Sequence, residues 1–220
     1  MFYSAMLRRM ATAPLSGRKA QAAVNDERIL EAARAVFIED PGAPISAVAE
    51  RAGVGISALY RRYPSKEELL RRICGDGLQR YIDEAEAALA DDGDPWEAFV
   101  KFMHRNVDAD TSTLTLSLAG TFTPSFELYR DAERASALGT RLFERTKTAG
   151  AIRDDVDVND VGFLLEQVAA VKVRDGGRTK QLRHRYLTLL LDALHSAPGT
   201  KLPGPPPTWE EVSGRWDAGS

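Results

Sequence analysis

The stretch VAERAGVGISALYRRY, residues 48–63, predicts two short helices joined by a tight turn. Ala49 is small enough to let two steeply crossing helices approach each other, and Gly53 can adopt the left-handed conformation that such a turn requires. Val54 and Leu59 would fill the space between the two helices. This spacing is typical of a helix-turn-helix, and a purely structural pair of helices is the alternative.

The second helix of this pair has two contrasting faces. Its expected inward face is apolar or aromatic and consists of Ile56, Leu59, Tyr60 and Tyr63. Its expected outward face is small or basic and consists of Gly55, Ser57, Ala58, Arg61 and Arg62. Small residues let a helix approach the edges of bases, and guanidinium groups bind guanine or phosphate. Because a solvated helix would more often carry mixed Glu and Lys, this acid-free face favours contact with DNA.

Charge is unevenly distributed along the chain of 220 residues, whose formal net charge is −3. Residues 1–75 contain 12 Lys and Arg against 8 Asp and Glu, whereas residues 76–220 contain 17 against 24. The first segment is therefore net positive by 4 charges and the second net negative by 7. A basic front on an acidic body indicates one end that faces a polyanion.

Several classes of protein are disfavoured by what the sequence lacks. The one cysteine, Cys74, cannot form an internal disulfide, and the three histidines show no metal-ligand spacing, so we expect no metal or cofactor site. No apolar run is long enough to span a membrane and no secretory signal is found, so we expect a cytoplasmic protein without membrane contact. No nucleophile elbow, Gly-rich phosphate loop or zinc-protease motif occurs, so we predict no catalytic residues.

The helical periodicity continues through most of the chain without a strand pattern, so the predicted fold class is all-α with about nine helices. The first helix is expected to begin at Asn25 as its N-cap, and Ser65 with Glu68 predicts a capping box before a long helix. The remaining long helices are expected over 66–89, 96–107, 125–149, 158–174 and 180–195. We predict four segments: a flexible basic arm (1–24), a three-helix helix-turn-helix domain (25–70), a helical body (71–197) and a Pro-rich tail with a short Trp-bearing helix (198–220).

Part of the sequence resembles a known family. The run AERAGV at 49–54, followed by LYRRYPSKEEL at 59–69, is similar to the DNA-binding domain of the tetracycline-repressor (TetR) family of bacterial regulators. The resemblance is specific over residues 25–70, and it implies that the body binds a small molecule and forms a dimer. Residues 180–216, with a Leu-rich helix, a Pro-rich segment and a Trp-containing end, also resemble a branch of the family that is common in actinobacteria.

The resemblance implies a role for each position that faces DNA. Tyr60, Arg62 and Lys66 would contact phosphates, and Ser46, at the start of the second helix, would touch the backbone or bases. The expected base-reading positions are Gly55, Ile56, Ser57, Ala58 and Arg61. Ala58 stands where many members have Thr, so one hydroxyl contact is missing, and Arg62 stands where His is common.

The body is expected to form a homodimer through its last two long helices. Helices 158–174 and 180–195 carry apolar stripes that are wider than one packed face requires. The expected contact residues are Val161, Leu165, Val168, Leu187, Leu190, Leu191 and Leu194. Burial of these residues within one chain is the alternative, and the family resemblance favours the dimer.

The body also contains candidates for binding a small-molecule effector. They are Phe99, Phe102, Met103, His104, Leu118, Phe122, Phe126, Phe143, Phe163 and Glu166. Plain core packing explains most of the apolar ones equally well, and a satisfied or exposed carboxylate explains Glu166. Together these features predict a ligand-responsive repressor that a small molecule releases from a palindromic DNA operator. A ligand-binding helical protein without a DNA function, and an enzyme fused to a helix-turn-helix, are the alternatives.

The C-terminal tail predicts a short capped helix. Thr208 and Glu211 have the spacing of a capping box, and Trp209, Val212 and Trp216 share one face behind it. A helix this short is not stable alone. We therefore expect its rings to pack on the body of the same subunit or of its dimer partner.

Overall fold

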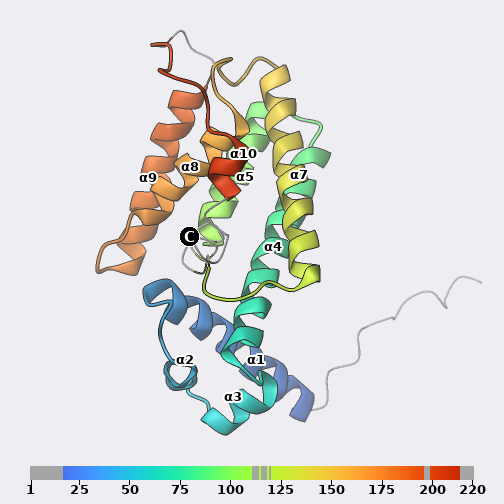
Figure 1. Ribbon diagram of the computed structural model, residues 1–220, viewed down its shortest axis with the longest axis vertical. Coiled ribbons are helices and arrows are strands. Elements are labelled where there is room, and N and C mark those ends of the chain that lie inside the picture. The colour runs from blue at the N-terminus through green and yellow to red at the C-terminus, as the bar shows by residue number, and fades with distance from the viewer. Residues whose placement is uncertain (1–16, 111–113, 115–117, 119, 196–198, 214–220) are drawn as a thin grey trace, which may run out of the picture.

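The computed structural model describes residues 17–110, 114, 118, 120–195 and 199–213, and the regular structure there is helical (Figure 1). The helices are α1 (Gly17–Glu39), α2 (Ile45–Ala52), α3 (Ile56–Arg62), α4 (Lys66–Ala90), α5 (Pro95–Asp108), α7 (Phe126–Thr148), α8 (Val158–Ala170), α9 (Gly176–Leu194) and α10 (Trp209–Ser213). One isolated bridge joins Ile152 to His195. The predicted all-α class is therefore confirmed, with nine helices among the described residues.

The first helix begins earlier than the sequence pattern indicated. α1 starts at Gly17 rather than at Asn25, so the flexible arm predicted over 1–24 is wrong for its last part. Ala and Gln residues before Asn25 favour helix, and the Gln21 amide donates to Asn25 Oδ1 at 3.2 Å. Asn25 therefore lies inside the helix and is not its N-cap. Residues 1–16 lie outside the described residues.

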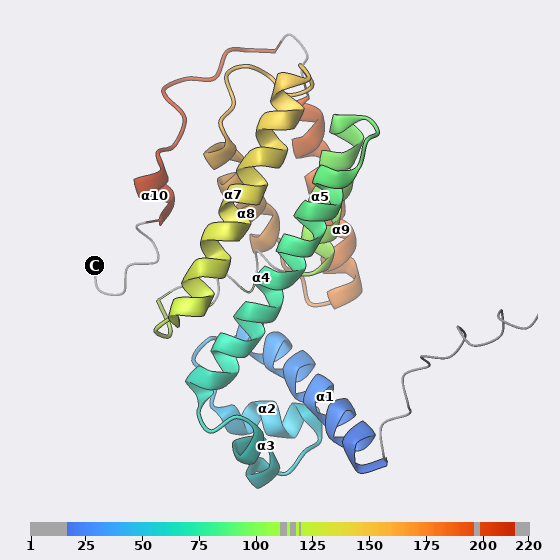
Figure 2. The ribbon, with the colours of Figure 1, turned by 90° about the vertical axis from the view of Figure 1, so that its right-hand side faces the viewer.

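The first three helices and the start of α4 enclose one apolar core, at the lower end of the molecule in Figures 1 and 2. Its most deeply buried side chains larger than alanine are Phe37, Val48, Leu59, Leu69 and Ile73. Leu114 and Leu118, which follow α5 in the chain, also belong to this core. The N-terminal unit is therefore completed by residues that come after the first helices of the body.

The long helix α4 takes part in both halves of the molecule. Leu70 and Ile73 lie in the first core, whereas Ile82 and Ala85 lie in a second core that α5, α7, α8 and α9 complete. Figure 2 shows α4 rising from the N-terminal helices to run beside α5 and α7. One continuous helix thus connects the helix-turn-helix to the body.

Of the two hydrogen bonds of the capping box predicted at the start of α4, only one is present among the described contacts. Ser65 Oγ accepts a hydrogen bond from the Glu68 backbone N–H at 3.1 Å. The Glu68 carboxylate pairs with Arg71 at 3.3 Å. The Ser65 hydroxyl therefore caps the helix alone, and the second half of the predicted capping box is absent among the described contacts.

The close packing of α4 against α7 depends on a glycine. A Cβ atom at Gly139 of α7 would overlap the hydroxyl of Tyr81 on α4. The Tyr81 ring meets Phe102 of α5 edge-on, with ring centroids 5.1 Å apart. Three helices of the body therefore converge on Tyr81.

The helices α8 and α9 are separated at a different point from the predicted one. The predicted helix 158–174 ends at Ala170, and Arg183 of α9 donates to the carbonyls of Ala169 at 2.8 Å and Val171 at 3.0 Å. α9 begins at Gly176 because the Asp175 carboxylate accepts from the Arg178 backbone N–H at 2.6 Å. Arg183 thus satisfies carbonyls at the end of α8 that have no partner within that helix.

The C-terminal tail follows the body through several polar contacts. Asp155 Oδ2 accepts from the Leu202 N–H at 2.9 Å, and the Asn159 amide donates to the Pro207 carbonyl at 2.9 Å. The capping box of Thr208 with Glu211 is confirmed, because the two residues exchange backbone-to-side-chain hydrogen bonds of 2.7 and 3.3 Å.

The aromatic face of the tail does not pack on its own chain at Trp209, and packing on a dimer partner stays a prediction. Trp209 is 60% exposed, so its ring does not pack into the body of its own chain. Val212 is partly buried, and α10 lies against α8. Trp216 lies outside the described residues.

Candidate DNA-binding interface

The turn between α2 and α3 has the predicted geometry. Gly53 adopts φ 65° and ψ 35°, and its N–H donates to the Glu50 carbonyl at 3.1 Å. The next residue, Val54, donates to the Ala49 carbonyl at 3.0 Å. Because a left-handed conformation is strained for residues with a Cβ, glycine is the residue that permits this turn. Residues 48–63 therefore form a helix-turn-helix.

The exposed face of α3 is broader than the sequence indicated. Only Leu59 and Tyr63 of the predicted inward face are buried, at 0% and 7% exposure. Ile56 is 40% exposed and Tyr60 46% exposed, so their assignment to the inward face is wrong. A helix of seven residues makes about two turns and can bury only a narrow side. Both residues instead join the surface that was expected to read DNA.

The predicted DNA-facing residues come together on one surface. Ser46, Gly55, Ser57 and Arg61 are exposed, and Ala58 is partly exposed. Arg61 has no ion-pair or hydrogen-bond partner among the described side chains. The surface of α3 contains no carboxylate of its own, so it is suited to a polyanion.

Arg62 differs from Arg61 because it is held by an acidic residue of α1. Its Nε donates to Asp26 Oδ1 at 2.7 Å, and its Nη2 donates to Asp26 Oδ2 at 3.0 Å. The Tyr63 hydroxyl donates to the same Oδ1 at 2.7 Å. The hydrogen bond from Arg62 is the main cause that lowers the pKa of Asp26, and the same bond raises the pKa of Arg62. Burial, more than this contact, raises the pKa of Tyr63 to about 12.

Lys66, at the first turn of α4, is already engaged within the N-terminal unit. Its Nζ donates to the carbonyls of Pro41 at 2.9 Å and Ala43 at 2.8 Å, and lies 5.0 Å from the Phe37 ring centroid. An ammonium group has three donors. The two carbonyls use two of these donors, and one N–H is left for a phosphate. The phosphate contact of Lys66 therefore stays a prediction.

The predicted effector-binding residues do not line one cavity. Phe99, Phe102, Met103 and Phe143 are buried in the second core. Leu118 and Phe122 pack with the first core instead, which places them on the DNA-binding side. Phe126 is 80% exposed at the start of α7, whereas Phe163 and Glu166 are partly buried on α8.

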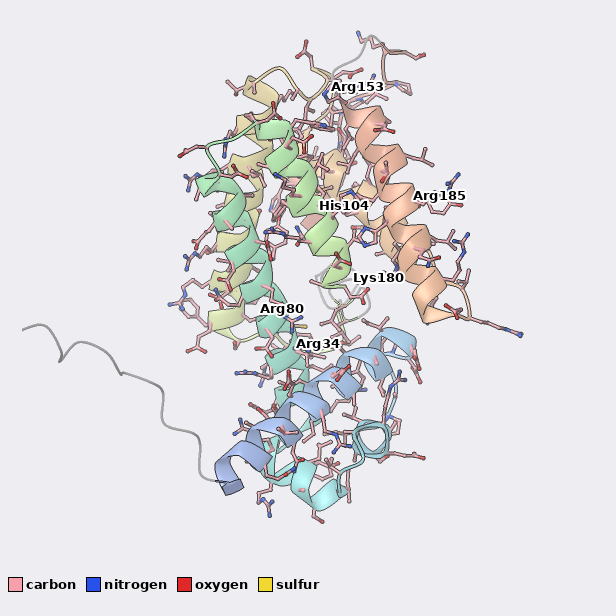
Figure 3. All side chains as sticks on the ribbon, turned by 180° about the vertical axis from the view of Figure 1, so that it is seen from behind. Arg34, Arg80, His104, Arg153, Lys180 and Arg185 are labelled. Atoms are coloured by element: carbon pink, nitrogen blue, oxygen red, sulfur yellow. The ribbon has the colours of Figure 1, made fainter. Side chains whose placement is uncertain are left out.

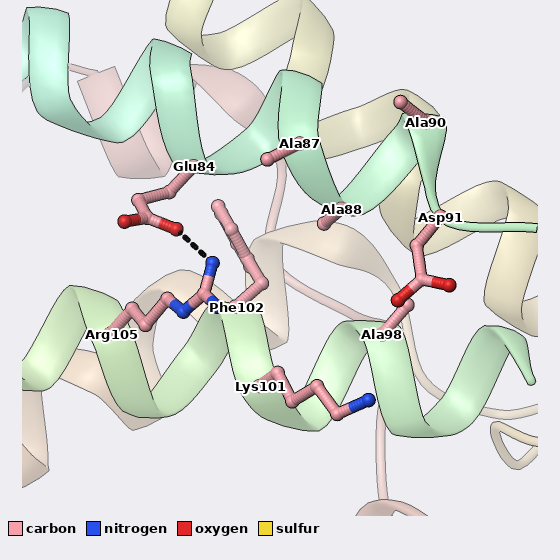
Figure 4. Close-up of a pocket in the computed structure, with 9 residues that line it drawn as sticks. All are labelled: Glu84, Ala87, Ala88, Ala90, Asp91, Ala98, Lys101, Phe102 and Arg105. Carbon is pink, nitrogen blue, oxygen red and sulfur yellow. Dashed lines mark hydrogen bonds and ion pairs between the residues drawn. The ribbon is translucent and has the colours of Figure 1, made fainter. Parts of the chain in front are cut away.

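A hollow of about 330 Å³ opens between α4 and α5 (Figure 4). Its floor is formed by small side chains and Phe102, and its rim carries the ion pair of Arg105 with Glu84 at 2.6 Å. Phe102 is the one predicted effector-binding residue that lines it. The hollow is an open groove on the outside of these helices and not an enclosed site.

A polar cluster that the sequence did not suggest joins α5 to α9. His104 Nδ1 and His184 Nδ1 lie 2.8 Å apart, and His184 Nε2 lies 3.0 Å from Asp108 Oδ1. Lys180 completes the cluster, with its Nζ 2.8 Å from Asp108 Oδ1 (Figure 3). Burial, followed by the neighbouring His184, lowers the pKa of His104. The two histidines are 80 residues apart in the chain, so no local motif could reveal the pair.

Comparison with known proteins gives the family. Residues 29–73 match the model described as bacterial regulatory proteins, tetR family, and residues 94–196 match the SbtR-like transcriptional regulator C-terminal domain. A TetR transcription regulatory protein from Mycobacterium vanbaalenii is 30% identical over 81% of this chain and 99% of its own, with a TM-score of 0.51. The chain belongs to the TetR family. Its members are transcription regulators and not enzymes, so an enzyme fused to the helix-turn-helix is no longer an alternative.

Other TetR structures have the same fold. A TetR transcriptional regulator from Streptomyces coelicolor is 26% identical over 78% of this chain and 99% of its own, with a TM-score of 0.54. The regulator LfrR from Mycobacterium smegmatis, in complex with proflavine, is 18% identical over 80% of this chain and 99% of its own, with a TM-score of 0.54. No curated protein sequence matches the chain. TetR regulators bind DNA operators, respond to small molecules and act as dimers.

The residues expected at the dimer contact of this TetR regulator are mostly internal. Val161, Val168, Leu187, Leu191 and Leu194 are 1–7% exposed in the single chain. Leu165 and Leu190 are partly exposed. Burial within one chain, the alternative to a dimer contact, is therefore correct for the first five. The outward side of α9 instead presents Tyr186 and Leu189, which are 44% and 55% exposed.

The described part of the chain contains neither a membrane-spanning helix nor a cluster of metal ligands. No helix there is long and apolar enough to cross a membrane. No group of three or more His, Cys, Asp or Glu side chains there could hold a metal ion.

Cys74 is partly buried, and burial raises the pKa of its thiol to about 12.

Proposed function

We propose that this TetR regulator is a cytoplasmic repressor that binds a palindromic operator as a homodimer and leaves it when a small molecule binds the body. The observation that carries the proposal is the exposed face of α3, which is free of acidic residues and follows the glycine turn at Gly53. Such a helix can enter a major groove, and a dimer places two of them one helical turn of DNA apart.

The proposed contacts divide by the chemistry of the side chains. Arg61 reads a base, because it is exposed in the last turn of α3 and has no partner among the described side chains. Gly55, Ser57 and Ala58 keep the helix close to the base edges, and Ile56 offers an apolar surface to a thymine methyl group. The contacts to the DNA backbone are made by Ser46, Tyr60, Arg62 and Lys66.

The homodimer is proposed to form through the outward side of α9. Residues at intervals of three and four make one apolar row there: Tyr186, Leu189, Leu190 and Ala193. The row lies beside the buried row of Leu187, Leu191 and Leu194, and a polar row with Gln181 and Arg185 covers the remaining side. An apolar row between a packed side and a polar side is suited to a helical-bundle contact with a second copy.

The effector is proposed to bind within the body among Phe99, Phe102, Met103 and Phe143. These side chains are closely packed, so a ligand would select a body conformation with more space between its helices. The fold of LfrR, which was solved with proflavine, supports a small molecule in a body of this kind. The change would reach α3 through α4, and the ion pair of Arg34 with Asp76 at 3.3 Å would carry it into α1.

Selection of duplexes from random DNA by the purified protein tests this proposal. We expect a palindromic consensus, a complex that contains two or four chains, and an affinity that falls steeply with salt because phosphate contacts release counterions. An affinity that is weak, independent of salt and equal for all duplexes would contradict the proposal and favour a ligand-binding protein without a DNA function.

A further inference from the structure

The end of α3 is fixed by one carboxylate. Asp26 on α1 accepts three hydrogen bonds, two from the Arg62 guanidinium and one from the Tyr63 hydroxyl, at 2.7–3.0 Å. The Asp26 side chain is only 17% exposed, whereas the Arg62 side chain is 62% exposed. The contact therefore anchors an exposed arginine to an almost buried acid.

The geometry leaves part of the arginine available. A guanidinium has five N–H donors in a planar fork, and Asp26 uses one on Nε and one on Nη2. The other N–H groups take no part in the contact with Asp26, and the exposed guanidinium can present them to a phosphate. A free arginine side chain samples many rotamers, and ordering it on DNA costs conformational entropy. An arginine that is already fixed in the free protein avoids much of this cost.

We propose that Asp26 is a positioning residue for DNA binding, which holds Arg62 at the end of α3 so that its remaining N–H groups meet a phosphate. The proposal rests on the proposed function, since it concerns the same DNA-binding surface. Asp26 acts through Arg62 and does not itself touch DNA.

Simple electrostatics predicts the opposite effect of removing Asp26. A carboxylate close to a polyanion repels it, so the loss of one negative charge should strengthen binding to any duplex. Positioning predicts that the same change weakens binding, because Arg62 loses its fixed orientation. The sign of the effect therefore separates the two roles.

The test compares Asp26→Asn with Glu50→Gln in the full-length protein. Glu50 is an exposed acid on α2 without a partner among the described side chains, so its substitution makes the same charge change elsewhere in the unit. We expect Asp26→Asn to weaken operator binding about 3- to 10-fold, and Glu50→Gln to leave it unchanged or strengthen it. Thermal melting of each variant reports whether the fold is intact.

Arg62→Ala and the double variant show whether Asp26 acts through Arg62. In the Arg62→Ala background, Asp26→Asn should no longer weaken binding, because the residue that it positions is absent. In Arg62→Ala, the slope of log affinity against log salt should decrease by about the amount that one phosphate contact contributes. The slope of Asp26→Asn should lie close to that of Arg62→Ala. If Asp26 had only a structural role, the folded protein of the Asp26→Asn variant would bind DNA with the same dependence of affinity on salt as the wild type.

Asp26→Glu provides a second test that does not alter charge. The longer side chain cannot keep the same three hydrogen bonds, so we expect an affinity between those of the wild type and Asp26→Asn. Tighter binding by Asp26→Asn, or an equal loss with and without Arg62, would overturn the proposal. A wild type that binds no duplex would contradict the proposed function instead.

Discussion

Arg61 and Arg62 are neighbours on α3 with opposite surroundings. Arg61 is exposed and has no partner in the described part of the chain, whereas both oxygens of Asp26 accept hydrogen bonds from Arg62. The free guanidinium can adapt to a base edge, and the fixed one is suited to a phosphate at a constant position. Removal of Arg61 should therefore change the base preference, whereas removal of Arg62 should change the affinity for all DNA sequences.

Arg61→Ala is expected to relax base preference at one position of each half-site. The loss of a bidentate guanine contact costs about 1–3 kcal/mol, so the preferred base at that position should lose its advantage. Selection from randomised duplexes measures this, with Arg62→Ala as the control that should weaken binding to all sequences alike. An unchanged consensus from Arg61→Ala would show that this arginine does not read a base.

Sequence reasoning at this scale succeeded where a residue type has one physical use. Gly53 could be predicted because only glycine adopts its conformation readily, and Leu59 because a large apolar residue between two crossing helices is expected to be buried. Ile56 and Tyr60 were misplaced because apolar spacing alone does not tell which turn of a short helix reaches the core. The partner of Arg62 could not be predicted, because Asp26 lies in another helix.

Among the elements, α9 has three rows with different surroundings. Leu187, Leu191 and Leu194 face the second core, while Tyr186 and Leu189 are exposed. Periodicity showed that α9 carries more apolar residues than one face needs. It did not separate the inward row from the outward one, because adjacent rows on a helix are only about 100° apart.

Leu189→Glu is expected to disrupt the homodimer without unfolding the chain. The side chain is 55% exposed in the single subunit, so a charge there is solvated in the monomer and buried without a partner in the dimer. Sedimentation of the variant should show a folded monomer. Gln181→Glu, on the polar row of the same helix, is the control and should leave the dimer intact. A dimeric Leu189→Glu protein would place the contact elsewhere.

The contact between α5 and α9 predicts a dependence of stability on pH. The pKa of His104 lies below its ordinary value of 6.5, because burial and the neighbouring His184 disfavour the charged ring. The unfolded chain therefore binds more protons in the window just below pH 6.5. The stabilisation is present above that pH and is lost as the pH falls through the lowered pKa of His104.

Chemical denaturation between pH 8 and pH 5 measures this dependence. We expect the free energy of unfolding to fall with acid in the wild type and to change less in His104→Gln. His195→Gln is the control. His195 lies at the end of α9, where its ring meets that of Trp96 edge-on, and it does not belong to the His104–His184 pair. This variant should therefore keep the wild-type profile. Identical profiles for His104→Gln and the wild type would show that the pair does not control stability.

At the scale of the whole molecule, the tail is attached by polar contacts along the body. Asp155, Asn159 and the capping box of Thr208 fix its course, although Trp209 remains exposed. The tail was predictable as capped and ordered, because capping boxes and prolines act locally. The exposure of Trp209 in the single chain was not predictable, because the surface that a ring meets depends on the tertiary fold.

Truncation after residue 197 is expected to lower the melting temperature by about 2–8 °C, because Asp155 loses the N–H of Leu202 and Asn159 loses the carbonyl of Pro207. Operator affinity at low temperature should be unchanged, since α10 lies beside α8 of the body and away from α3 (Figure 1). Asn159→Ala, which removes one of these contacts, should cause a smaller decrease. A truncated chain that melts like the wild type would show that the tail adds nothing to stability.

The placement of Leu114 and Leu118 in the first core limits how this molecule can be recombined. A hybrid that joined residues 17–90 to another body would keep α1 to α4 but lose these two leucines. A piece that ends with α4 is therefore an incomplete DNA-binding unit, and a piece that extends to Leu118 also carries α5, whose Phe99 and Phe102 belong to the second core. New specificities are more accessible through substitutions on the face of α3, because that face adds nothing to either core.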